Sequence, residues 1–153
     1  SIGDSVVSGY RHLPQPRTAI HDLIVKYAHA AIDISDGFIA DLTHLCEASH
    51  IGAQIDVHTM RFSDAVQEFI NTREGGLETV LSGGDDYELL MTMKVDDFNE
   101  FHAACAARGV PVQRIGQCFQ YPENGENTKG QHVILRNKEG NAMKFSKTGW
   151  QHF

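Results

Sequence analysis

The sequence predicts an α+β fold in which helices pack against a mixed β-sheet of about six strands, in a three-layer arrangement. The first indication is that short stretches with strand-like apolar character are separated by stretches whose apolar residues recur at helical spacing. The second is a pair of apolar runs near the end of the chain, on either side of residues 137–141, which is the pattern of a β-hairpin. Strands separated by helices favour parallel pairing and a hairpin is antiparallel, so we expect both kinds of pairing.

The first half of the chain alternates between helix and strand. Apolar residues at helical spacing predict a helix from Thr18 and a longer helix over 37–49. Alternation of apolar and polar residues predicts two strands, over 29–34 and 53–58. Gly52 follows the longer helix, and we expect it to supply the left-handed residue with which many helices end.

The second half continues the alternation. Residues 63–82 predict two short helices, the first of them capped by Ser63 or Asp64. Residues 87–93 are apolar enough for a central strand. The remaining predicted elements are a helix from Asp96 or Asp97 to Arg108 that stops at Gly109, a strand over 112–115, and a hairpin of 133–136 with 142–145.

The length of 153 residues, 41% of them apolar, suits one domain with a hydrophobic core. Residues 1–19 contain several glycines and prolines, so we expect an extended connector there and the domain over 20–153. The chain begins with Ser1 rather than methionine, inside this connector. We therefore expect it to be a piece of a longer polypeptide.

Charge and cysteine content exclude several classes of protein. The formal net charge is −7 and the basic residues form no cluster, so we expect no nucleic acid partner. No apolar run approaches the roughly 18 residues of a membrane helix, and the first residues do not resemble a secretion signal. The three cysteines show no metal-binding spacing, which predicts reduced thiols in a cytoplasmic protein.

Residues 31–42 concentrate the polar chemistry at one predicted turn. Asp33 and Ser35 lie two positions apart at the end of a predicted strand, so their side chains share one face. Helical spacing begins directly afterwards, which puts Asp36 at a helix N-terminus. Two carboxylates, a hydroxyl and free backbone N–H groups suit a cation and a phosphate held side by side. The structural alternative is that Asp36 only caps the helix while Asp33 faces water.

A second acidic stretch, residues 82–88, follows a predicted helix and precedes a predicted strand. Gly83 and Gly84 allow a tight turn there, and Asp85 and Asp86 bring carboxylates to a strand edge. Taken alone, such a sequence is most often a solvated turn. Its occurrence together with the first acidic turn favours a shared ligand site.

Four segments carry a resemblance to a known family: Asp33–Phe38, Asp41–His44, Ser82–Leu90 and Gly149–Phe153. Together they resemble the thiamine-monophosphate kinases, which share a superfamily with aminoimidazole ribonucleotide synthetase and selenophosphate synthetase. The likeness runs from about Tyr10 to Phe153 and covers only that family's C-terminal domain. It implies the C-terminal fold of aminoimidazole ribonucleotide synthetase for 20–153, and makes 1–19 the connector from an N-terminal domain.

The resemblance also implies an activity and its partners. It implies ATP- and Mg²⁺-dependent phosphorylation of thiamine monophosphate to thiamine diphosphate by direct phosphoryl transfer, and a homodimer for the full-length enzyme. Because the family's N-terminal domain supplies much of the nucleotide site, we expect this chain alone to be inactive. An acidic protein can handle two anionic substrates when carboxylate-held Mg²⁺ neutralises their charge.

The resemblance implies roles for five residues. Asp33 and Asp36 would bind Mg²⁺, and Ser35 would contact ATP. Asp85 and Trp150 would contact thiamine monophosphate, although the family usually has Glu in place of Asp85. No residue is assigned as a general acid or base, because a phosphate dianion is already a competent nucleophile.

Three further points stay open at this level. Asp41 and His44 lie on the predicted helix one turn from the site, either behind the ligand-binding residues or on a solvated face. The chain could instead be a non-catalytic ligand-binding module. It could also belong to another ATP-dependent enzyme of the superfamily, such as one that acts on an aminoimidazole or on selenide, and the aromatic Trp150 would have no evident role with selenide.

Overall fold

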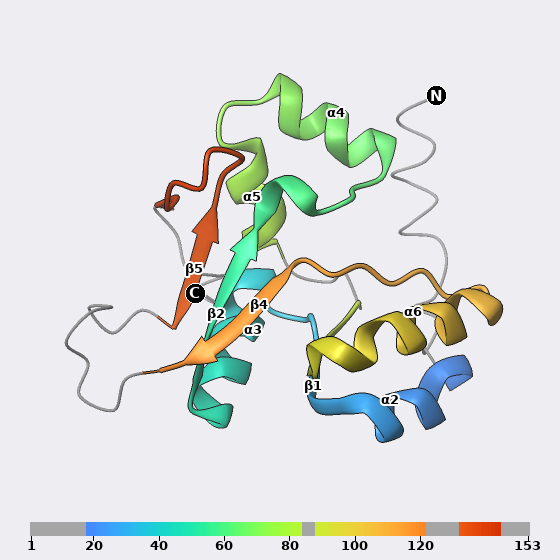
Figure 1. Cartoon of the computed structure of the whole chain (residues 1–153). Helices are drawn as coiled ribbons and strands as arrows, with labels where there is room; N and C mark the ends of the chain where they lie inside the picture. Colours follow the sequence, from blue (N-terminus) through green and yellow to red (C-terminus); the bar gives the residue numbers. More distant parts are fainter. Residues whose placement is uncertain (1–17, 84–87, 122–131, 145–153) are drawn as a thin grey trace.

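The structure, a computed structural model, describes residues 18–83, 88–121 and 132–144 (Figure 1). Helices and strands alternate along these ranges, which confirms the predicted α+β class. Nearly all of the predicted connector, residues 1–19, lies outside the described residues. The elements in order are η1 Thr18–Ile20, α2 His21–Tyr27, β1 Ala28–Asp33, α3 Phe38–Ser49, β2 Ile51–Asp56, η2 Val57–Thr59, α4 Asp64–Thr72, α5 Gly76–Ser82, β3 Leu89–Met93, η3 Val95–Asp97, α6 Phe98–Ala107, β4 Gly116–Gln120 and β5 Val133–Arg136.

Within the described part of the chain, the five strands form two sheets. β1 and β3 pair antiparallel, with Asp33 opposite Leu89 at one end of the ladder. The second sheet has the order β4-β2-β5, in which β4 is antiparallel to β2 and β5 is parallel to it. The sequence predicted about six strands with both kinds of pairing, and the mixed pairing occurs in the second sheet.

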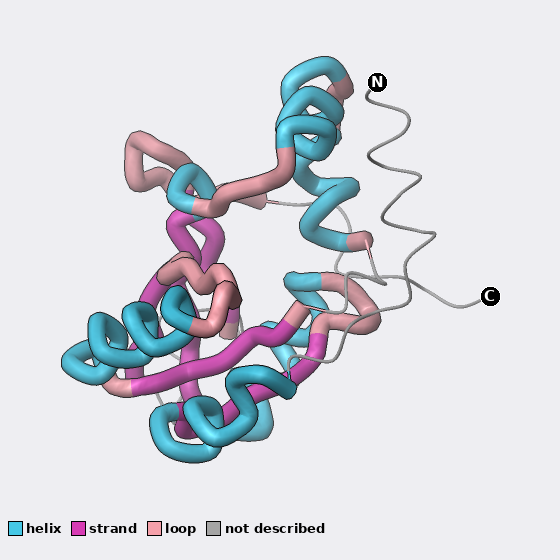
Figure 2. Tube along the Cα trace, turned by 90° about the vertical axis from the view of Figure 1, so that its right-hand side faces the viewer, coloured by secondary structure: helices cyan, strands magenta, loops and turns pink. Residues whose placement is uncertain are grey.

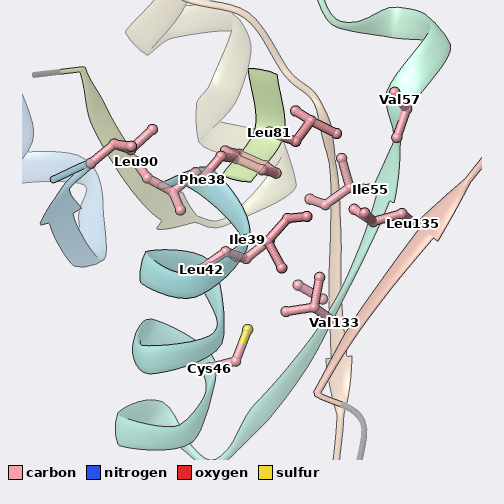
Figure 3. Packing of buried hydrophobic residues seen from close by; sticks show 12 residues of the cluster. Phe38, Ile39, Leu42, Cys46, Ile55, Val57, Leu81, Leu90, Val133 and Leu135 are labelled. Carbon is pink, nitrogen blue, oxygen red and sulfur yellow. The ribbon is translucent and has the colours of Figure 1, made fainter. Parts of the chain in front are cut away.

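Helix α3 lies between the two sheets and carries the centre of the main hydrophobic core (Figure 3). It contacts β1 on one side and both β2 and β5 on the other. Its apolar residues recur every three or four positions, so they form a continuous stripe that both sheets cover. Its buried apolar residues are Phe38, Ile39, Leu42, Leu45 and Cys46.

The opposite face of the β1–β3 sheet is covered by α2 and α6. The side chains of β3 alternate, so that Leu90 joins the main core while Met91 and Met93 pack against a second cluster. Phe101 and Tyr27 form the centre of this second cluster and contact each other edge to face. In both views α2 and α6 lie toward one end of the molecule and α4 toward the other (Figures 1 and 2).

Most predicted helices are confirmed, including the capping residue of α4. The hydroxyl oxygen of Ser63 accepts a hydrogen bond from the backbone N–H of Val66, as an N-cap residue does. Arg136 forms an antiparallel bridge with Ala142, and this pairing closes the predicted hairpin turn. No helix in the described ranges is both long enough and apolar enough to cross a membrane.

Two predicted boundaries are wrong. The left-handed residue after α3 is His50, with φ of 53°, whereas Gly52 lies inside β2. The strand expected over 112–115 begins instead at Gly116, and the apolar residues before it pack against the cores without strand pairing. A Cβ atom at Gly116 would lie 2.1 Å from the carbonyl oxygen of Gln54, so close pairing with β2 begins where the side chain is absent.

The cysteines agree with the prediction of free thiols. Cys46 on α3 and Cys105 on α6 are fully buried, one in each hydrophobic cluster, and both are free. Burial raises the pKa of the Cys46 thiol to about 11 and also raises the pKa of the Cys105 thiol. Both residues therefore act as apolar packing groups at neutral pH.

Candidate functional site

The turn between β1 and α3 gathers three of the predicted site residues. Asp33 ends β1, and its neighbours Ser35 and Asp36 lie in the short connection to the helix. All three side chains are exposed, whereas Ile34 and Phe38 are buried in the main core. The three polar groups therefore lie on one solvent-facing turn, which agrees with the prediction that the side chains of Asp33 and Ser35 share one face.

The backbone of this turn is held by a residue of the following helix. Oδ2 of Asp41 accepts hydrogen bonds from the backbone N–H groups of Ser35 at 2.8 Å and Asp36 at 3.0 Å. Asp41 lies in the first turn of α3 and is only 2% exposed. Its other oxygen lies 3.9 Å from Nδ1 of His44, whose side chain is largely exposed.

The second acidic stretch comes to the same turn at both of its described ends. The backbone N–H of Ile34 donates to the carbonyl oxygen of Glu88 at 2.8 Å. At the other end, a Cβ atom on Gly37 would lie 2.7 Å from the carbonyl oxygen of Ser82 and 3.1 Å from that of Gly83. Gly37 also has a φ of 116°, a conformation that favours glycine. The two acidic stretches are therefore neighbours in space, although nearly fifty positions separate them in the sequence.

Two predicted site residues belong to segments that the structure does not describe. Asp85 lies within residues 84–87 and Trp150 within residues 145–153, both outside the described residues. The structure brings together Asp33, Ser35 and Asp36 and sets the two ends of the segment containing Asp85 beside them. The roles of all five residues stay predictions.

The donor set of the turn fits Mg²⁺ bound jointly with phosphate groups. The carboxylates of Asp33 and Asp36 are exposed, and neither carboxylate has a hydrogen bond or ion pair with another described residue. Oxygen ligands suit Mg²⁺, which keeps several waters and commonly binds one or two carboxylates together with substrate phosphates. No group of three metal-binding side chains occurs in the described ranges, so the turn alone offers a partial coordination shell.

Asp41 is the residue whose contribution the sequence did not identify. The sequence left two positions open for Asp41, one behind the ligand-binding residues and one on a solvated face. The structure favours the first, because Asp41 is buried and accepts a hydrogen bond from the backbone of the turn. One signal was available: Asp41 lies three positions after Phe38 and four before Leu45, on the apolar stripe of its helix. A carboxylate on such a stripe needs buried partners, and the nearest free donors are the N–H groups of the preceding turn.

The chain belongs to the family described as AIR synthase related protein, C-terminal domain, whose model matches residues 12–124. Within it, the chain is similar to thiamine-monophosphate kinases, as the motifs predicted. It is 42% identical over 108 residues to that of Escherichia coli K12, which covers 70% of this chain and 33% of the relative. It is 35% identical over 144 residues to that of Salmonella typhimurium, covering 94% of this chain and 41% of the relative.

Solved structures give the same result for the fold. The thiamine-monophosphate kinase from Stenotrophomonas maltophilia K279a matches with a TM-score of 0.68 and 32% identity, over 85% of this chain and 37% of that one. A structure described as AaThiL complexed with AMPPCP and TMP matches with a TM-score of 0.66 and 28% identity, over 92% and 38%. The chain thus spans about two fifths of the length of most of these relatives.

Proposed function

We propose that this chain is the C-terminal part of an ATP- and Mg²⁺-dependent kinase that phosphorylates thiamine monophosphate to thiamine diphosphate. The observation that carries the proposal is the meeting of two acidic stretches at one solvent-facing turn, in a chain similar to thiamine-monophosphate kinases. One relative's structure contains AMPPCP and TMP, which supports a nucleotide and a phosphate ester as the two ligands. The proposed enzyme is a cytoplasmic homodimer with no nucleic acid or membrane partner.

The proposed reaction joins two anions. The bond between the γ-phosphorus of ATP and its bridging oxygen breaks, and a bond to an oxygen of the acceptor phosphate forms, giving ADP and thiamine diphosphate. When bound, Mg²⁺ supplies the charge neutralisation that lets the two phosphates approach. The acceptor phosphate is a competent nucleophile as a dianion, so no residue of the chain needs to remove a proton.

The residues of the chain orient these groups. Asp33 and Asp36 supply carboxylate oxygens for Mg²⁺, and their exposure on one turn supports this assignment. Ser35 lies between them in the sequence, and its hydroxyl is proposed to donate to a phosphate oxygen of ATP. Asp85 and Trp150 are proposed to contact thiamine monophosphate, Trp150 by stacking on the cationic ring system.

The test is substitution of Asp33→Asn and Asp36→Asn in the full-length polypeptide that carries this chain, assayed with ATP, Mg²⁺ and thiamine monophosphate. Loss of a Mg²⁺ ligand removes several kcal/mol of charge stabilisation, so each variant should lose at least about 100-fold in kcat/KM. Asp96→Asn is the matched control, because Asp96 is also exposed but lies on η3, outside the β1–α3 turn. A full-length protein without this activity, or Asn variants as active as the control, would contradict the proposal.

The isolated chain provides a second test. Because relatives are more than twice as long, we propose that the chain alone lacks a complete active site and has no measurable turnover. Turnover by the isolated chain at the rate of a full-length relative would show this part of the proposal to be wrong.

A further inference from the structure

We propose that Asp41 is a positioning residue for the β1–α3 turn, and that its buried carboxylate fixes the backbone from which Ser35 and Asp36 present their oxygens beside Asp33. This inference deepens the proposed function and rests on it only for the identity of the ligand. The two hydrogen bonds to Asp41, on which the positioning role depends, are present whatever ligand the turn binds.

The burial of Asp41 requires compensation. A carboxylate that is 98% buried loses most of its hydration, which is unfavourable unless hydrogen bonds replace the lost water. Its Oδ2 receives two such bonds, from consecutive backbone N–H groups of Ser35 and Asp36. Hydrogen bonds to a charged acceptor are about twice as strong as neutral ones, so this pair holds the turn firmly.

The side chains of the turn do not hold it. Those of Asp33 and Asp36 are exposed and make no bonds to other described residues. Among the described residues, the turn is fixed by three backbone interactions: the two amides on Asp41, the Ile34 amide on Glu88, and the approach of Gly37 to Ser82. The first of these acts directly on Ser35 and Asp36, whereas Asp33 is held by its pairing with Leu89 in the β1–β3 ladder.

A purely structural role makes a different prediction. Asp41 also lies in the first turn of α3, where a negative charge stabilises the helix through its dipole. Removing that stabilisation would lower the melting temperature of the chain and leave the local order of residues 35 and 36 and their ligand affinity unchanged in the folded state. A positioning role changes both.

The first readout is hydrogen exchange of individual backbone amides in the full chain, measured by NMR. Asp41→Ala should speed exchange at Ser35 and Asp36 at least about tenfold, because both amides lose their acceptor. Asp41→Asn keeps one oxygen that can accept both bonds, so its effect should be smaller and confined to the same two amides. Leu45→Ala is the matched control, since it destabilises the same helix from its buried face and leaves Asp41, the acceptor of both amides, in place.

The second readout is the apparent affinity for Mn²⁺ alone, from relaxation of the amides over 33–37 at a temperature where every variant is folded. Loss of a residue that orients metal ligands typically weakens metal affinity about 10-fold or more, which is expected for Asp41→Ala. Asp41→Asn should retain affinity within about threefold of wild type, and Leu45→Ala should equal wild type. Asp33→Asn should abolish binding at the turn.

The outcomes separate the two proposals. Unchanged exchange at Ser35 and Asp36 in both Asp41 variants would overturn the positioning role, as would equal Mn²⁺ affinity in Asp41→Ala and Leu45→Ala. If Asp33→Asn binds Mn²⁺ as wild type does, the proposed metal site is wrong, while the exchange data still decide the role of Asp41. If Asp41→Ala does not fold, Asp41→Asn decides it alone: its neutral amide oxygen is a weaker acceptor than a carboxylate, so exchange at the two amides should still rise, and unchanged exchange would overturn the proposal.

Discussion

Gly37 connects the two acidic stretches because it has no side chain. The carbonyl oxygens of Ser82 and Gly83 occupy the space where its Cβ atom would lie, and the positive φ of Gly37 adds a second constraint. Ser82 and Gly83 lead directly into the segment that contains Asp85. At the scale of single residues, one missing methyl group therefore sets the distance between the turn and the second acidic stretch.

The substitution Gly37→Ala tests this contact. We expect a loss of about 2–4 kcal/mol in the free energy of unfolding, from backbone strain together with a clash that only movement of the Ser82 backbone can relieve. Gly109→Ala is the matched control, because Gly109 also has a positive φ, of 71°, but has open space where the Cβ atom would lie. It should cost about 1 kcal/mol. Equal losses in urea unfolding would mean that the contact with Ser82 does not constrain the turn.

At the scale of elements, α2 and α6 are joined by polar contacts near both ends. Arg108, just after α6, forms a two-pronged ion pair with Asp22 and also donates to the carbonyl oxygen of Ala19 at 2.8 Å. Near the other end, the Tyr27 hydroxyl donates to Glu100, and Nζ of Lys26 lies 3.2 Å from the same carboxylate. These contacts fix the relative orientation of two helices that otherwise share only a small apolar cluster.

The Asp22 pair makes the acid stability of the chain testable. The hydrogen bond from Arg108 lowers the pKa of Asp22 from 3.8 to about 2. Because the folded state has the lower pKa, this contribution to stability is fully present above about pH 4 and is lost as the pH falls toward 2. The difference in melting temperature between wild type and Asp22→Asn should therefore shrink steadily across this range.

The control for this experiment is Asp96→Asn, which removes an exposed carboxylate that has no ion pair among the described residues. The melting temperature of Asp96→Asn should differ from that of wild type by a small amount, and this difference should not shrink between about pH 4 and pH 2 as it does for Asp22→Asn. A constant difference between wild type and Asp22→Asn from about pH 5 to about pH 2 would show that the ion pair is absent in solution.

The sequence predicted the elements that depend on local pattern and missed features that depend on tertiary contacts. β1, α3 and β2 were predictable because their apolar periodicity reports which face is buried. β4 was not, because Gly116–Gln120 has no alternation of apolar and polar residues and pairs with β2 through its backbone, while the apolar residues before it pack into the cores outside the strand. Backbone hydrogen bonding of this kind leaves little trace in side-chain pattern.

The candidate site shows the same division. Asp33, Ser35 and Asp36 could be grouped in advance because strand and helix periods fix which side chains share a turn. The nearness of the second acidic stretch was favoured by the occurrence of two acidic turns and by the resemblance, but local pattern could not establish it, since it depends on the pairing of β1 with β3 and on the packing of Gly37. The hydrogen bonds of Asp41 were not predicted, although they are local: Asp41 lies on the buried stripe of α3, five and six positions after the two amides that donate to it.

At the scale of the whole molecule, the β1–β3 sheet is shared by two hydrophobic clusters. Leu90 packs into the main core on one face, and Met91 and Met93 pack into the second cluster on the other. Neither cluster can be exposed without uncovering one face of the same two strands, which would be only marginally stable alone. We therefore expect the two clusters to unfold in a single cooperative step.

The two buried cysteines provide a probe for each cluster. Cys46 lies in the main core and Cys105 in the second cluster, and both are inaccessible in the folded state. In a background with Cys118→Ser, which removes the exposed thiol, the labelling rates of the two cysteines should rise with the same dependence on urea concentration. Labelling of Cys105 at distinctly lower urea would mean that α2 and α6 open independently. A single transition would mean that a substitution in α2 or α6 shifts the same unfolding equilibrium as a substitution in the main core, and so also changes the stability of the β1–α3 turn.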